Sequence, residues 1–153
     1  MSASRSGRRR GAARAGVYAL LAGVLTLSIL SVAETAPQAS AWAGVFNKDQ
    51  VERGRTAYNA QCARCHGETL GGGENSPALV DDVFFTIWDG KTVGALVEYV
   101  RLTMPSDGPG KISRKRCIDI AAFVLSANGF PAGDAELPAE LDALNQITIT
   151  RTK

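Results

Sequence analysis

Small and apolar residues recur at helical spacing in the first half of the chain. Between Lys48 and Cys65 they fall on one face of a predicted helix, and Gly54 and Tyr58 lie one turn apart on that face. A shorter segment, Asp82 to Trp88, carries three bulky aromatic side chains and predicts a second helix.

Two further helices are predicted from their boundary residues. Thr92 is a suitable N-cap for a helix over residues 93–103. The Met104-Pro105 step ends this helix, because the residue before a proline avoids the helical region. Ser113 is a suitable N-cap for the last main helix, and Asn128-Gly129 is a strong stop signal for it.

The segments between these helices are predicted to be loops. Residues 67–77 and 104–111 are rich in Gly, Asn and Pro, which tolerate or impose non-helical backbone. The tail, residues 133–153, is expected to be a surface arm with one short strand near Ile147 and Ile149. Because strand content is close to nil, the pattern predicts an all-α fold.

The first 43 residues have the layout of a secretory leader. Five arginines and no acid occupy the first sixteen residues, and the seventeen residues from Val17 to Ala33 carry no charge. Small residues allow cleavage near Ala43, with an earlier site at Ser31-Val32-Ala33. We therefore expect an exported protein with a folded domain at 44–133 and a C-terminal extension at 134–153. An uncleaved membrane anchor is the alternative, because seventeen residues are near the lower limit for a span.

The net charge changes when the leader is set aside. The whole chain has 17 Lys and Arg and 15 Asp and Glu, a formal net charge of +2. Five of these bases and one acid, Glu34, precede residue 44, so twelve bases and fourteen acids remain and the net charge is about −2. Nucleic-acid binding is not expected, because a surface that neutralises phosphates needs a marked excess of bases.

Cys62-Ala63-Arg64-Cys65-His66 is the attachment sequence for c-type haem. Two cysteines three positions apart on a helical turn can reach both vinyl groups of one porphyrin, and the adjacent histidine then presents its imidazole to the iron. A thioredoxin-like redox pair and half of a zinc site are the alternatives. The first belongs in an α/β pattern, which is missing, and the second lacks ligands because His66 is the only histidine. We expect one covalent haem c on Cys62 and Cys65, with His66 as an iron ligand.

Elimination indicates the sixth iron ligand. The chain has two methionines, of which Met1 belongs to the leader and Met104 lies in a stiff loop that can hold sulfur over the distal face. A loop methionine that only fills a gap is the alternative. Ligation by histidine and methionine raises the reduction potential relative to two nitrogen ligands. It also closes both axial positions, which disfavours a peroxidase or a gas sensor.

The order of these motifs resembles that of class I c-type cytochromes, from Val51 to Gly133. The shared segments are Gly54-x-x-x-Tyr58, Cys62-x-x-Cys65-His66-Gly67, Pro77-Ala78-Leu79, Met104-Pro105 and a last helix through Ile120 and Phe123. The resemblance implies the class I cytochrome c fold, with three to five helices around one haem. It also implies that the Gly54 face crosses the last helix, and that the Pro77 carbonyl accepts a hydrogen bond from His66 Nδ1.

A narrower resemblance concerns Trp88-x-Gly90 and residues 125–133, which are similar to small cytochromes that partner periplasmic quinoprotein dehydrogenases. Trp88 is expected to pack beside the porphyrin, with propionate binding by its indole N–H as the alternative, and Tyr99 is expected to be a core residue. The implied function is a periplasmic monohaem carrier that moves single electrons from a dehydrogenase to another cytochrome or a terminal oxidase. The protein performs no bond-making chemistry on a substrate, and no membrane span is expected once the leader is cleaved.

The alternative function is a haem-bearing electron-transfer subunit of a dehydrogenase complex, which the tail after Gly133 would suit.

Two further features of the sequence allow more than one role. Cys117, the third cysteine, is expected to be a small buried hydrophobic residue, with an intermolecular disulfide or a replacement iron ligand as alternatives. A basic cluster follows the Met104 loop and comprises Lys111, Arg114, Lys115 and Arg116. It is interpreted either as a docking surface for an acidic partner or as an ordinary solvated helix start.

Overall fold

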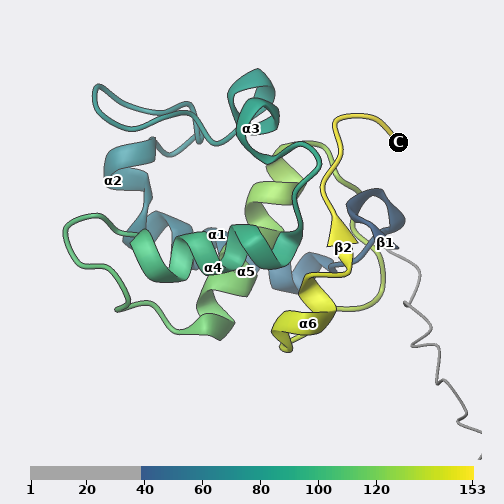
Figure 1. Cartoon of the computed structure of the whole chain (residues 1–153). Helices are drawn as coiled ribbons and strands as arrows, with labels where there is room; N and C mark the ends of the chain where they lie inside the picture. The colour runs from purple at the N-terminus through teal and green to yellow at the C-terminus, as the bar shows by residue number, and fades with distance from the viewer. Residues whose placement is uncertain (1–38) are drawn as a thin grey trace, which may run out of the picture. The chain divides into compact units, whose positions relative to one another are not determined.

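The computed structural model describes residues 39–153, so the first 38 residues of the expected leader lie outside it. The elements in chain order are β1 (Ala39–Ser40), the 3-10 helix η1 (Ala41–Ala43), α1 (Lys48–Gln61), α2 (Ala63–His66), α3 (Asp81–Trp88), α4 (Val93–Thr103), α5 (Arg114–Ala127), α6 (Leu141–Leu144) and β2 (Ile147–Thr148) (Figure 1). The expected all-α fold is thereby confirmed, with six α-helices within residues 39–153 in place of the three to five expected. None of the helices within residues 39–153 is long and apolar enough to cross a membrane.

Side-chain caps begin the three longest helices. The side chain of Asn47 accepts a hydrogen bond from Gln50 N before α1, that of Thr92 from Ala95 N before α4, and that of Ser113 from Arg116 N before α5. The N-caps predicted at Thr92 and Ser113 are therefore confirmed. The first helix is shorter than predicted, because the backbone of Cys62 leaves the helical region (φ −122°, ψ −36°) and separates α1 from α2.

Helix α1 packs chiefly against α5, and the contact is closest at Gly54. A Cβ atom at this position would overlap the backbone carbonyl of Asp119 and lie 2.9 Å from the Cβ of Phe123. One turn along α1, the ring centroid of Tyr58 lies 5.3 Å from that of Phe123. The predicted crossing of the first and last main helices is confirmed at these residues.

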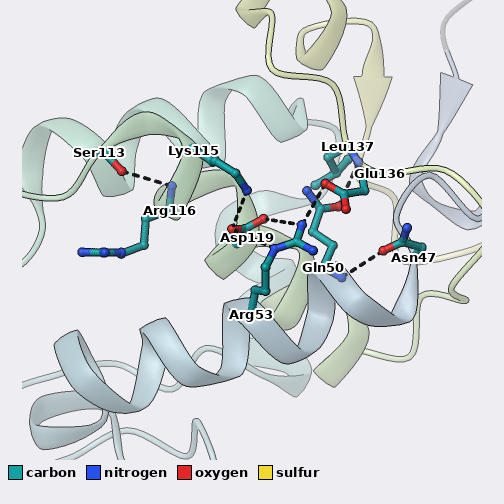
Figure 2. A network of polar contacts seen from close by, with 9 residues as sticks. All are labelled: Asn47, Gln50, Arg53, Ser113, Lys115, Arg116, Asp119, Glu136 and Leu137. Carbon is teal, nitrogen blue, oxygen red and sulfur yellow. Dashed lines mark hydrogen bonds and ion pairs between the residues drawn. The ribbon is translucent and has the colours of Figure 1, made fainter.

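A polar network ties the tail to this helix pair (Figure 2). Arg53 Nη2 lies 3.2 Å from Asp119 Oδ1 of α5 and 2.8 Å from Glu136 Oε2 of the tail. The buried side chain of Gln50 accepts a hydrogen bond from the backbone N–H of Leu137 at 2.8 Å. Both contacts start from α1, so the tail is fixed against the same helix that leads to the CxxCH motif.

The tail is part of the core, and the expectation of a surface arm is wrong. Four of its apolar side chains are 4% exposed or less: Leu137, Leu144, Ile147 and Ile149. The predicted short strand is present as β2, and Ile147 and Ile149 face inward because alternate residues of a strand share one side. The apolar alternation was visible in the sequence, but the surface that it covers was not.

The N-terminal end of the described chain packs against this tail. Strand β1 pairs with β2 in parallel, with Ala39 opposite Ile147. Ala41 is completely buried, and the indole N–H of Trp42 donates a hydrogen bond to the carbonyl of Thr150 at 2.9 Å. Residues 39–43, which were expected to belong to the leader, therefore contribute to the folded domain.

Candidate haem site

The CxxCH motif forms a tight turn directly after α1. Cys62 N donates to the carbonyl of Tyr58 at 2.7 Å, and His66 N donates to the carbonyl of Cys62 at 3.0 Å. Cys62 is half-buried, Cys65 is exposed, and both thiols are free. Burial raises the pKa of the Cys62 thiol to about 11, with smaller contributions from Cys117 and Cys65. A redox-active cysteine pair needs a lowered pKa, so this site does not suit thioredoxin-like chemistry.

The imidazole of His66 is 8% exposed, and its Nδ1 lies 2.8 Å from the backbone carbonyl oxygen of Pro77. A carbonyl only accepts hydrogen bonds, so this contact requires the proton on Nδ1. In the neutral imidazole this tautomer leaves the lone pair of Nε2 available to a metal. The donor set therefore fits an iron ligated by His66.

The loop between His66 and Pro77 is held in place by backbone contacts. The hydroxyl of Tyr58 donates to the carbonyl of Gly67 at 2.7 Å, and Gly72 N donates to the carbonyl of His66 at 2.9 Å. Gly72 has φ +84°, and a Cβ there would lie 2.8 Å from the amide nitrogen of Ala78. Only glycine fits this approach, which returns the chain to the histidine ring.

Met104 directly follows α4, and its amide donates to the carbonyl of Val100 at 3.0 Å. Its side chain is half-buried. The loop that it begins reaches the CxxCH turn, because Arg64 Nη2 lies 2.5 Å from Asp107 Oδ2. In Figure 1, α2 and the loop between α4 and α5 lie on the same side of the domain. The structure thus brings the segments of His66 and Met104 together.

Trp88 ends α3 and is 7% exposed. Its ring meets that of Tyr99 edge-on, with centroids 5.6 Å apart, and the ammonium group of Lys91 lies 5.2 Å from its centroid. Within the described residues, no hydrogen bond occupies its indole N–H. Trp88 is buried in the core, and its packing beside a porphyrin and propionate binding by its N–H both stay predictions.

Four large apolar side chains are exposed on α3 and α4 by 39–56%, namely Val83, Ile87, Tyr99 and Leu102. The expectation that Tyr99 is a core residue is wrong, because its side chain is 49% exposed, although its ring meets that of the buried Trp88. Trp88 ends α3, and Met104 directly follows α4. Exposed apolar side chains on these two helices are therefore suitable for packing against an apolar group such as a porphyrin.

Cys117 is completely buried, and its Sγ lies 3.8 Å from the carbonyl oxygen of Ile112. Desolvation by burial raises the pKa of this thiol, so it stays protonated and unreactive at neutral pH. The role of a small buried hydrophobic residue is confirmed. An intermolecular disulfide would first require this part of the core to open.

Comparison with known proteins gives two similarities. A family described as "Cytochrome C oxidase, cbb3-type, subunit III" matches residues 49–124, which contain the CxxCH motif, Pro77 and Met104. The crystal structure of the sulfane dehydrogenase SoxCD from Paracoccus pantotrophus matches with 23% sequence identity and a TM-score of 0.47. That match covers 71% of this chain and 61% of the other, so this chain spans less than two thirds of its length.

No curated protein sequence matches the chain. The family match agrees with the helical fold and with the crossing of α1 and α5 at Gly54. The chain is a class I c-type cytochrome, an electron-transfer haem protein.

Proposed function

We propose that this protein is a periplasmic monohaem carrier, which takes single electrons from a dehydrogenase and passes them to another cytochrome or a terminal oxidase. The observation that carries the proposal is the His66 imidazole, buried and bound through Nδ1 to the Pro77 carbonyl, directly after two free thiols. A haem c held there would supply a one-electron couple. The apolar leader supports export, which haem attachment to such a motif requires.

In this proposal each site residue has a separate task. Cys62 and Cys65 would attach the porphyrin through their thiols. The Pro77 carbonyl fixes the ring orientation of His66 and increases the basicity of Nε2. Met104 would supply a thioether as the second protein ligand of the iron, which would raise the reduction potential relative to a nitrogen ligand.

A carrier is supported over a permanent subunit by the packing of the tail. An extended tail that did not pack on its own domain could have bound another subunit of a complex. Instead, Leu137 and Glu136 are bound to Gln50 and Arg53 of the same chain, and Ile149 is fully buried. Gel filtration of a native extract distinguishes the two roles, since a carrier elutes at the size of one small protein.

The basic cluster supports docking less strongly than its sequence suggests. Arg114 is paired with Glu98 at 3.4 Å, and Lys115 with Asp119 at 3.2 Å. Lys111 and Arg116 make no ion pair within residues 39–153, and Figure 2 shows the Arg116 side chain directed away from the Asp119 network. Electrostatic steering of an acidic partner would therefore depend on these two charges, and oxidation rates should decrease only modestly with salt.

Haem attachment is tested by producing the full chain in a bacterial host that matures c-type cytochromes. We expect a red protein that gives a pyridine haemochrome spectrum of the c type and the mass of the polypeptide plus one haem. The double variant Cys62→Ala/Cys65→Ala should lose the covalent haem. Cys117→Ala is the matched control and should retain it. A colourless wild-type protein with the mass of the bare polypeptide would overturn the proposal.

A further inference from the structure

One ion pair connects the two segments that are proposed to carry the axial ligands. Arg64 lies between the two cysteines of the CxxCH motif, and Asp107 lies three residues after Met104. Their side chains meet at 2.5 Å across 43 residues of sequence. No other hydrogen bond or ion pair joins residues 62–78 to residues 104–113 in the described part of the chain.

The Met104 loop has few internal contacts that could keep it in place. Between Met104 and Ile112 its one backbone hydrogen bond within the described chain runs from Gly108 N to the carbonyl of Pro105, at 2.9 Å. The loop is anchored at one end by α4 and at the other by the buried side chain of Ile112. Segments with so few contacts open locally at low free-energy cost. The contact of Asp107 with Arg64 is therefore well placed to influence how often the loop opens.

We propose that the Arg64–Asp107 pair is a positioning contact, which holds the Met104 loop against the CxxCH turn and so keeps the thioether on the haem iron. The proposal rests on the proposed function, because it requires a haem between these two segments. Neither residue touches the metal, and both act through Met104. The pair joins the loop directly to the CxxCH turn, and its loss leaves the loop held only at its two ends.

The expected effect is small but measurable. The side chains of Arg64 and Asp107 are 75% and 61% exposed, so solvent screens their attraction. Exposed pairs of this kind shift an equilibrium by about two- to fivefold. The pKa of Asp107 lies below its ordinary value because of Arg64, which agrees with an attractive contact.

The test measures how readily added imidazole replaces Met104 in the oxidised holoprotein, because replacement requires the loop to open. Imidazole binding is followed by loss of the weak near-infrared sulfur-to-iron band. We expect Asp107→Asn and Arg64→Gln each to increase the apparent imidazole affinity by about two- to fivefold, and the double variant to add little to either. High salt should increase the affinity of the wild type and leave that of Asp107→Asn nearly unchanged.

Glu74→Gln is the matched control, because it removes one exposed negative charge from the loop before Pro77 without breaking an ion pair described in this structure. It should bind imidazole like the wild type. Equal affinities for the wild type, Asp107→Asn and Glu74→Gln, with the near-infrared band present, would overturn the role of the pair alone. A wild type that carries haem but lacks the band would overturn Met104 as a ligand, and the role of the pair with it.

Discussion

Gly54 of α1 lies directly against the backbone carbonyl of Asp119 on α5, with no room between them for a side chain. Because α1 continues into Cys62, this contact fixes where the CxxCH turn lies relative to the last main helix. One turn later, Tyr58 packs on Phe123 and donates to the carbonyl of Gly67, the residue after His66. The helix crossing and the haem site are therefore built from the same face of one helix.

Gly54→Ala should destabilise the fold. A Cβ would overlap the Asp119 carbonyl, and a backbone group in the middle of a packed helix cannot move aside as a flexible side chain can. We expect the free energy of unfolding to fall by about 1–3 kcal/mol, measured by urea denaturation. Gly71→Ala is the control, because a Cβ there meets only the Thr69 hydroxyl at 3.5 Å, and its change should stay within about 0.5 kcal/mol. Equal changes for both variants would contradict the close contact at Gly54.

Tyr58 should make stability fall at high pH. Burial raises the pKa of Tyr58 to about 12. The folded state thus keeps the phenol proton at pH values where the unfolded chain has lost it. The stabilisation is complete below about pH 10, the ordinary pKa of tyrosine, and is lost as pH rises through about 12.

Tyr58→Phe tests this by removing both the proton and the hydrogen bond to Gly67. At neutral pH we expect a loss of about 1–2 kcal/mol, because the Gly67 carbonyl loses its donor. Between pH 10 and 11.5 the unfolding free energy of the variant should fall less steeply than that of the wild type. Tyr99→Phe, which removes a hydroxyl without a hydrogen bond in the described residues, should remain within about 0.5 kcal/mol at neutral pH. Parallel pH profiles for the wild type and Tyr58→Phe would contradict the prediction.

Local rules were sufficient to locate the four main helical segments in the sequence, whereas the short helix α6 in the tail was not predicted. The side-chain oxygens of Thr92 and Ser113 each accept a hydrogen bond from a backbone N–H in the first turn of α4 and α5. Donor and acceptor lie within four consecutive residues, so the sequence alone indicates the cap. The site motif was equally local, since Cys62, Cys65 and His66 lie on one turn. What the sequence could not show were contacts between distant segments. The Arg64–Asp107 pair, the burial of the tail and the position of Tyr99 all depend on how separate elements pack.

The mature protein should begin before Ala39. Cleavage near Ala43 was the expectation from the small residues of the leader. The packing of residues 39–43 argues for an earlier site, because Ala41 is fully buried and Trp42 is bound to Thr150 and stacked 4.3 Å from Phe130. Removing them would expose the apolar face of β2. Ser31-Val32-Ala33 satisfies the small-x-small pattern upstream. Intact mass and N-terminal sequencing of exported protein decide this, and a chain that starts at Gly44 would contradict it.

Met104→Ala should change the oxidised spectrum and lower the reduction potential. Loss of the thioether removes the ligand that stabilises the reduced iron, so we expect the near-infrared band to disappear and the midpoint potential to fall. The covalent haem should remain, because Cys62, Cys65 and His66 are unchanged, and the haemochrome spectrum checks this. Ser106→Ala is the control, since it shortens an exposed side chain of the same loop that makes no hydrogen bond within the described residues, and it should leave the band in place. An unchanged band and potential in Met104→Ala would show that another group ligates the iron.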